Sequence, residues 1–251
     1  MQQTNRSRHR HITSFQVISL GFLSAILLGS LLLMLPIATK SGQCTSFLDA
    51  LFTATSAVCV TGLVVNDTAT YWSLFGQGVI LLLIQIGGMG IITIAIAIAV
   101  VSGRKIGLMQ RSTMQEAISA PTVGGIVRRT QFIIRTTILI EIIGAVLLAP
   151  VFCRDFGFWK GIWYSLFHSI SAFCNAGFDL IGIRTPFSSL TSYSVQPIVN
   201  LVIMMLIIAG GIGFLTWEDI KNRKWHFKKY RMQSKVIFMV TGILILSLIH
   251  I

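Results

Sequence analysis

Long uncharged stretches divide the chain into segments that are each long enough to cross a membrane. Ile12 to Ile37, Ala69 to Gly103 and Thr185 to Trp217 contain no charged residue at all. About 20 apolar residues span the hydrocarbon core of a bilayer. The pattern therefore predicts five spans, near residues 13–35, 72–101, 132–150, 195–216 and 234–251.

The linkers 38–71 and 151–194 are too apolar to be solvated loops. Each contains a short apolar segment, Phe47 to Ser56 or Gly161 to Ser171, followed by small residues and a glycine. A helix of about 12 residues is roughly 18 Å long, too short to cross the membrane but long enough to enter it and return. Irregular backbone at membrane depth is tolerated only where it is buried or lines a watery path. Both linkers are therefore predicted to form re-entrant helices.

The two short segments align with each other without a gap. Six of the thirteen positions from Leu51 to Leu63 are identical to those from Leu166 to Phe178. We interpret this as an internal repeat of span, re-entrant helix, glycine turn and span, in which both copies begin on the same side of the membrane. The predicted units are a tail (1–12), a first repeat (13–103), a linker (104–131), a second repeat (132–217), a basic linker (218–233) and the first span of an incomplete third repeat (234–251).

Composition supports an integral membrane protein. Of the 251 residues, 54% are hydrophobic and only 11% are charged, and the mean hydropathy is +0.79. A soluble domain carries roughly a quarter charged residues, so a soluble globule and a disordered chain are both excluded. The predicted fold class is all-α integral membrane, with parallel repeats of span, re-entrant helix and span.

The net charge of +12 is distributed unevenly between the two sides. With the N-terminus inside, sixteen Lys and Arg residues fall on the N-terminal side of the membrane and four on the other. Such an excess marks the cytoplasmic side. We expect a multi-pass protein of the cell membrane with a cytoplasmic N-terminus. The basic charge is explained by this topology rather than by nucleic acid, and the run from Lys221 to Lys235 suits anionic lipid or a protein partner equally.

The glycine turns are the candidate cation-binding sites. Ser46 and Asp49 form a capping-box pattern at the start of the first short helix, whose C-terminal, partially negative end would then point into the membrane. The chain next turns through Val60 to Leu63, where glycine permits a backbone path that turns successive carbonyls one way. A ring of such carbonyls can replace the water shell of a cation. The alternative is that Gly62 and Gly177 simply end helices.

The sequences TATSAVCVTGL and HSISAFCNAGF, placed between spans, resemble the Trk/Ktr/HKT potassium transporters, most closely the bacterial Ktr membrane subunit. The resemblance covers nearly the whole chain from Phe15. It implies a potassium-channel-like fold of four repeats around one pore, with potassium as the transported ion, no cofactor in this chain and no enzymatic activity. By position, the implied selectivity-filter residues are Val60, Thr61, Gly62, Leu63, Asn175, Ala176, Gly177 and Phe178.

The resemblance also implies partners and ion preference. Family members are homodimers of pore subunits regulated by a cytosolic ring of nucleotide-binding domains. Serine at the first filter-glycine position accompanies sodium transport in the plant branch, so Gly62 favours potassium. This chain departs from the family pattern because it contains two full repeats and stops inside the first span of a third.

Several alternatives remain open at this stage. The chain could be a two-repeat cation channel that dimerises to complete its pore, or a sodium-selective member of the same family. A transporter for another solute and an intramembrane enzyme are disfavoured, because the repeats are parallel and no catalytic cluster lies at membrane depth. Glu141 is the one acid inside a span; we favour a structural role, accepting hydrogen bonds from a neighbouring re-entrant helix or turn, over a functional one.

Overall fold

The computed structural model describes residues 13–90, 93–94, 115, 126–183, 185–224 and 226–250, and this part of the chain is helical without any named strand. The predicted tail and most of the linker 104–131 lie outside the described residues. The main helices are α1 (Ser14–Met34), α2 (Phe47–Val58), α3 (Leu74–Met89), α6 (Ile126–Phe156), α7 (Phe158–Phe173), α8 (Pro197–Gly211), α9 (Phe214–Arg223) and α10 (Met232–His250).

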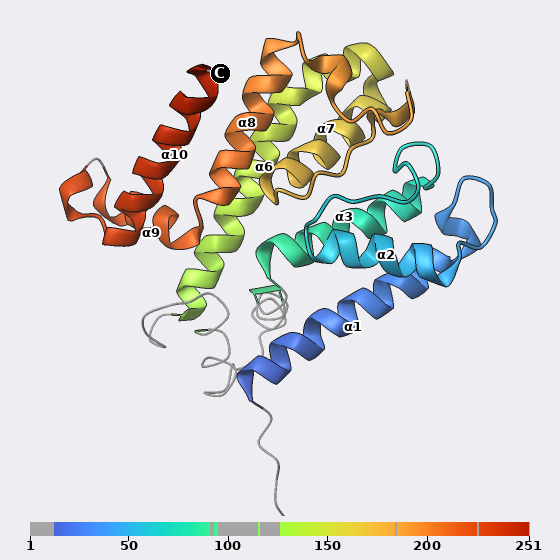
Figure 1. Ribbon diagram of the computed structural model, residues 1–251, viewed down its shortest axis with the longest axis horizontal. Helices are drawn as coiled ribbons and strands as arrows, with labels where there is room; N and C mark the ends of the chain where they lie inside the picture. The colour runs from blue at the N-terminus through green and yellow to red at the C-terminus, as the bar shows by residue number, and fades with distance from the viewer. Residues whose placement is uncertain are drawn as a thin grey trace, which may run out of the picture.

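The helices pack as two groups of three. The short helix α2 packs against α1 and α3, and the short helix α7 packs against α6 and α8. Contacts between α3 and α7 join the two groups, while α10 follows α9 at one side (Figure 1). This arrangement brings the C-terminal ends of α2 and α7, which are far apart in the sequence, to the middle of the molecule.

Local sequence determines where the first long helix begins and ends. The Thr13 hydroxyl accepts a hydrogen bond from the Gln16 backbone, and the Gln16 side chain accepts one from the Thr13 N–H, which is a complete capping box. The helix stops at Met34 because the residue before Pro36 is driven into an extended conformation, φ −63° and ψ 141° at Leu35. At the other group, Pro197 opens α8 in the first helical position, where its missing N–H costs nothing.

Two of the predicted spans differ from the helices observed. The helix from Leu74 ends at Met89, where Gly90 adopts φ 81°, and beyond Gly90 only residues 93–94 of the predicted span 72–101 are described. The helix from Pro197 ends at Gly211, Gly213 adopts φ 83°, and α9 leaves at 93° to α8. By length and composition, two described helices can cross a membrane, or three if the bent α8–α9 pair counts as one span. Hydropathy alone missed these breaks because a glycine turn leaves the apolar pattern intact.

Close helix contacts occur at glycines. A Cβ atom added to Gly29 of α1 would lie 2.6 Å from a methyl carbon of Leu83 on α3. In the second group, a Cβ on Gly144 of α6 would lie 2.8 Å from a methyl carbon of Leu206 on α8. Small residues at helix interfaces let backbones approach closely, which is how helices associate in lipid.

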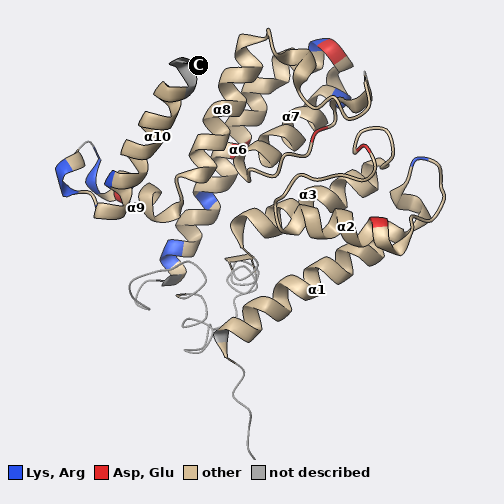
Figure 2. Cartoon of the chain, in the orientation of Figure 1, with Lys and Arg blue, Asp and Glu red and all other residues tan. Residues whose placement is uncertain are grey.

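Charged residues lie mostly toward the ends of the described helices (Figure 2), and Glu141 in the middle of α6 is an exception. Near α9, Glu218 accepts from Arg129 of α6 at 3.0 Å and from Arg231 at 3.1 Å. Asp219 is buried and accepts from the backbone of Arg231 and from the hydroxyl of Ser234 at the start of α10. These two carboxylates connect α6, α9 and α10 on the side predicted to be cytoplasmic.

Candidate functional site

The chain after α2 follows a defined helix-ending motif. Val60 adopts φ 57°, its N–H donates to Ala57 at 3.3 Å, and the Thr61 N–H donates back to the Ser56 carbonyl at 2.9 Å. These two bonds, with a left-handed residue between them, make a Schellman motif. Gly62 follows with φ 75°. At the helix start, the Ser46 hydroxyl accepts from the Asp49 N–H at 3.2 Å, which is one of the two bonds of the expected capping box.

The chain after α7 follows the same path. Asn175 adopts φ 58°, its N–H donates to Ala172 at 3.0 Å, and the Ala176 N–H donates to the Ser171 carbonyl at 2.8 Å. Gly177 then adopts φ 73°. Each of these residues is aligned with its counterpart after α2. We call residues 59–65 the first loop and residues 174–180 the second loop.

The two loops touch each other at their glycines. A Cβ atom on Gly62 would lie 2.6 Å from the carbonyl oxygen of Ala176 and 3.1 Å from the Cα of Gly177. A Cβ atom on Gly177 would lie 3.4 Å from the Cα of Gly62. The structure therefore brings the two predicted glycines, from distant parts of the chain, into direct backbone contact.

Glycines on the following helices leave space for the ends of α2 and α7. A Cβ on Gly87 of α3 would collide with the carbonyl oxygen of Val58, the last residue of α2. A Cβ on Gly210 of α8 would collide with the carbonyl oxygen of Phe173, the last residue of α7. The absence of a side chain at both glycines thus lets α3 and α8 pack directly against the residues where the loops start.

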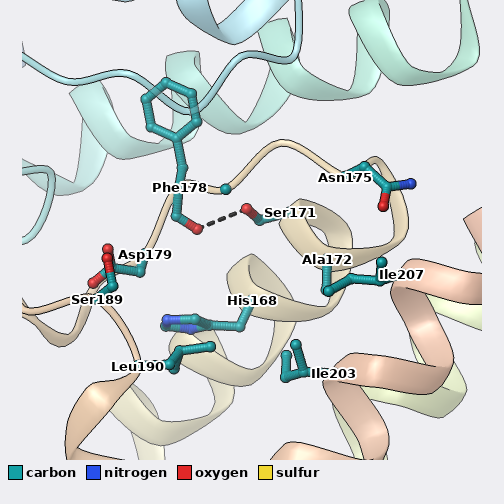
Figure 3. Close-up of a pocket in the computed structure, with 11 residues that line it drawn as sticks. His168, Ser171, Ala172, Asn175, Phe178, Asp179, Ser189, Leu190, Ile203 and Ile207 are labelled. Atoms are coloured by element: carbon teal, nitrogen blue, oxygen red, sulfur yellow. Dashed lines mark hydrogen bonds between the residues drawn. The ribbon is translucent and has the colours of Figure 1, made fainter. Parts of the chain in front are cut away.

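The side chains that hold the two loops differ. In the first loop, the hydroxyls of Ser56 and Thr61 bond to each other at 2.8 Å. In the second, the Ser171 hydroxyl donates to the carbonyl oxygen of Phe178 at 2.6 Å (Figure 3). His168 also reaches the second loop, because the Leu180 N–H donates to its Nε2 at 3.2 Å.

A pocket of about 300 Å³ lies behind the second loop. His168, Ser171 and Asp179 contribute polar atoms to its wall, and Ile203 and Ile207 of α8 form an apolar side (Figure 3). Burial raises the pKa of the Asp179 carboxyl above its usual value. The carboxylate nevertheless accepts a hydrogen bond from the Ile181 N–H at 2.9 Å, which fixes the chain as it leaves the second loop.

Asp67 joins the segments that follow the two loops. Its Oδ1 accepts from the N–H and the hydroxyl of Thr70 at 2.8 and 2.9 Å, and its Oδ2 accepts from the Phe187 N–H at 2.9 Å. Asp67 is 7% exposed, and Gly182 packs directly against its carboxylate. Asp67 therefore acts as a buried clamp between segments 120 positions apart in the sequence.

The structural interpretation of Glu141 needs a different partner from the one expected. Its carboxylate accepts from the Gln85 side chain of α3 at 2.9 and 3.1 Å rather than from a short helix or turn. The short helix α7 bonds instead to the Glu141 backbone, since the Ser169 hydroxyl donates to that carbonyl at 2.6 Å. Gln85 also lies 3.9 Å from the Cys174 sulfur at the start of the second loop.

All eight predicted site residues lie in the two loops, but they are not equally placed. The Phe178 side chain is buried, whereas Leu63, its counterpart, is 62% exposed. The Phe178 carbonyl is directed toward its own helix by Ser171. Sequence reasoning missed Ser171 and Asp67 as residues that hold the loops. His168, which replaces Thr53 of the first repeat, was expected to be packed or hydrogen-bonded, but its partner in the second loop was not predicted.

Comparison with known proteins identifies the family of the chain. The family model described as "TrkH: Cation transport protein" matches residues 2–241. The chain is 42% identical over 239 residues to the potassium/sodium uptake protein NtpJ of Enterococcus hirae, covering 95% of this chain and 51% of that protein. It is 46% identical over 235 residues to the Ktr system potassium uptake protein B of Bacillus subtilis, covering 93% and 50%.

A third relative, the Ktr system potassium uptake protein B of Vibrio alginolyticus, is 36% identical over 92% of this chain and 50% of that protein. The chain thus spans about half the length of these curated relatives. The family match itself extends over nearly all of the 251 residues. The protein described here belongs to the TrkH family of cation transport proteins.

Proposed function

We propose that this chain forms two of the four walls of a membrane pore that takes up potassium ions. The observation that carries the proposal is the contact between the two loops at Gly62 and Gly177, where two backbone segments of the same conformation meet. Backbone carbonyls arranged side by side can replace the hydration shell of a potassium ion. The proposed filter is Val60–Leu63 together with Asn175–Phe178.

The proposal includes a repeat architecture of span, re-entrant helix and span. Extending the alignment of the loops back along the chain pairs Gly29 with Gly144, and the alignment of the following helices pairs Leu83 with Leu206. These four residues make equivalent contacts in the two groups of helices. Gly87 and Gly210 likewise pack on equivalent carbonyls. Matched contacts at matched positions support two copies of one unit.

Uptake of potassium by this route does not require ATP hydrolysis by the chain itself. A membrane potential supplies about 2.3 kcal/mol per charge per 100 mV, enough to draw cations inward. Entry from outside would pass the loops first, and the basic residues of α9 and its neighbours would lie in the cytosol, as the positive-inside rule requires. The proposed location is the cell membrane, with several spans and a cytoplasmic N-terminus.

The proposed partners are a second pore subunit, membrane lipids and a cytosolic nucleotide-binding regulatory ring. The printed names of the Bacillus and Vibrio relatives place them in a "Ktr system", which supports a multi-component assembly. Lys221, Lys224 and Lys228 are exposed on the side predicted to be cytoplasmic. That surface suits either a protein or anionic lipid headgroups.

Sodium is the second candidate ion. The Enterococcus hirae relative is named a potassium/sodium uptake protein. Glycine rather than serine at position 62 supports potassium as the preferred ion. Parallel measurements of potassium and sodium uptake decide between the two.

The test of the main proposal is growth and uptake in bacteria that lack other potassium systems. A chimera would carry these 251 residues followed by the half of the Bacillus subtilis relative that the alignment leaves unmatched. We expect it to restore growth at low potassium and to take up potassium faster than sodium. A chimera that reaches the membrane in normal amounts yet moves neither ion would overturn the proposal.

Two further measurements concern topology and completeness. In a background without native cysteines, a cysteine replacing Asn66 should react with an impermeant reagent from outside, and one replacing Lys224 should not; the reverse result contradicts the proposed orientation. The 251-residue product alone should not conduct in liposomes, because lipid-exposed loop backbone costs several kcal/mol per unsatisfied group. Conduction there would favour the two-repeat channel that dimerises.

A further inference from the structure

His168 is a buried side chain that bonds to the backbone on both sides of its ring. It is 2% exposed. Its Nε2 accepts from the Leu180 N–H at 3.2 Å, and its Nδ1 lies 2.7 Å from the Tyr164 carbonyl oxygen. Because Nε2 accepts, the proton of the neutral ring is on Nδ1 and is donated to Tyr164. The imidazole therefore connects α7 to the end of the second loop.

Ser171, one turn further along α7, holds the same part of the chain. Its hydroxyl donates to the Phe178 carbonyl oxygen at 2.6 Å, and the hydroxyl is itself buried with the residue (Figure 3). A carbonyl that accepts this bond points toward α7. Its oxygen is thereby engaged by Ser171 rather than free to bind an ion.

The first loop has no equivalent fastening among the described hydrogen bonds. Thr53 aligns with His168, and its hydroxyl donates to the Asp49 carbonyl inside its own helix at 2.8 Å. Ser56 aligns with Ser171, and its hydroxyl bonds to the Thr61 hydroxyl at the start of the loop. Neither side chain bonds to the segment beyond Gly62. Among the hydrogen bonds of the described residues, these aligned positions therefore tie only the second loop at its outer end.

We propose that His168 and Ser171 are positioning residues that hold the outer end of the second loop on α7 and withdraw the Phe178 carbonyl from the ion path. This inference rests on the proposed filter function. The outermost coordination plane then receives a carbonyl from Leu63 without one from Phe178. A cation at that level keeps more of its water, and discrimination between potassium and sodium falls to the planes nearer α2 and α7, formed by the carbonyls of Val60, Thr61, Asn175 and Ala176.

The transport test uses the chimera defined above and measures KM and maximal rate for both ions. His168→Leu keeps the volume of the side chain but removes its acceptor, and we expect the ratio of sodium KM to potassium KM to fall about fivefold or more. His168→Gln places an amide oxygen within reach of the Leu180 N–H and should restore much of the ratio. Ser171→Ala frees the Phe178 carbonyl and should shift the potassium KM at least threefold.

The matched control is Thr53→Ala, the same position in the first repeat. It should leave both KM values within twofold of the parent. A role in folding alone would lower the amount of protein and the maximal rates for both ions together, without changing the KM ratio. Unchanged KM values in His168→Leu and Ser171→Ala, at normal protein amounts, would overturn the inference.

Hydrogen exchange of the purified chimera separates this inference from the proposed function. The Leu180 amide should exchange at least tenfold faster in His168→Leu than in the parent, while Val65 in the first loop stays unchanged. A parent chimera that moves no potassium contradicts the proposed function but leaves this measurement valid. Equal exchange at Leu180 in parent and variant contradicts the inference even if transport is normal. If His168→Leu yields no folded protein, His168→Gln and Ser171→Ala carry both measurements.

Discussion

The first and second loops have the same backbone conformation but are held by different side chains. The second residue of each loop, Val60 or Asn175, is left-handed, and a glycine with φ near 75° follows two positions later. The hydroxyl of Ser56 bonds near the beginning of its loop, whereas that of Ser171 bonds near the end. The comparison teaches that helix-end geometry and glycine determine the path, while side chains decide which carbonyls stay free.

The largest effect is expected at Gly62. Serine there must adopt φ 75°, which costs about 1–2 kcal/mol, and its Cβ would lie 2.6 Å from the Ala176 carbonyl. We expect Gly62→Ser in the chimera to lower potassium uptake by roughly tenfold or more and to raise sodium uptake relative to potassium. Ion uptake measured side by side checks this.

Gly177→Ser sharpens the comparison, because its Cβ meets only the Gly62 Cα at an ordinary 3.4 Å. Its effect should be smaller than that of Gly62→Ser. Gly211→Ser is the neutral control, since nothing lies within 4 Å of a Cβ there. Gly87 is unsuitable as a control because a Cβ would strike Val58. Equal losses of potassium uptake in Gly62→Ser and Gly177→Ser would contradict the asymmetric contact between the two glycines.

The next largest effect is expected at the clamp between the loops. Asp67→Asn puts an amide NH₂ where one of the backbone or hydroxyl donors needs an acceptor, at a cost of about 1–3 kcal/mol. The melting temperature of the chimera should fall by several degrees. Scanning fluorimetry in detergent measures it.

Asp179→Asn is the matched control. Burial raises the pKa of Asp179, so the ionised form is disfavoured in the folded protein and lowers its stability above the unfolded pKa. A neutral amide removes that penalty and retains an oxygen for the Ile181 N–H, but it gives up an acceptor for the Ser189 side chain or the Gly182 backbone. We expect these opposing effects to leave a smaller loss of melting temperature at pH 7 than Asp67→Asn causes. A larger loss at Asp179 than at Asp67 would contradict the assignment of Asp67 as the clamp.

A smaller difference is expected between Gly88 and Gly211, which occupy aligned positions. A Cβ on Gly88 would strike the Cys174 side chain, whereas one on Gly211 meets nothing. Gly88→Ala should lower the free energy of unfolding by about 1–3 kcal/mol, and Gly211→Ala should raise it by up to about 1 kcal/mol. Adding Cys174→Ala removes the Sγ but leaves the Cβ, which lies 2.7 Å from the added atom, so it should relieve part of the Gly88→Ala defect. No relief would show that the damage lies elsewhere.

The smallest effect is expected at Glu141. Its carboxylate accepts from Gln85, and Glu141→Gln keeps one acceptor oxygen there. Potassium uptake by the chimera should stay within about twofold of the parent across pH 6–8, while Glu141→Ala should lower thermal stability. A large loss of transport in Glu141→Gln at normal protein amounts would support the functional interpretation instead.

Much of the fold could be predicted from the pattern of apolar residues and glycines. The short helices α2 and α7 were expected from segment length, and the capping hydroxyl of Ser46 from its spacing to Asp49. The turns at Gly90 and Gly213 were not expected as helix ends. Hydropathy reports the free energy of transfer to an apolar phase, and a change in φ at glycine leaves it unaltered.

The candidate site was predicted only as a set of backbone positions. Contacts such as Asp67 to Phe187 or His168 to Leu180 depend on where the chain returns in space. Residue type gives no distance between segments far apart in the sequence, so these partners had to come from the structure. The repeat itself gave the one useful hint, because a difference between copies, His168 against Thr53, coincides with a difference in bonding.

The left-handed conformation of Val60 has a consequence for protein engineering. A β-branched residue at φ 57° is strained, and such strain costs of order 1–3 kcal/mol. The aligned residue in the second repeat is Asn175, which has φ 58°, and asparagine tolerates this conformation. The substitution Val60→Asn should therefore raise the stability of the folded protein without changing the backbone path of the first loop. A more stable variant is better suited to crystallisation or cryo-electron microscopy.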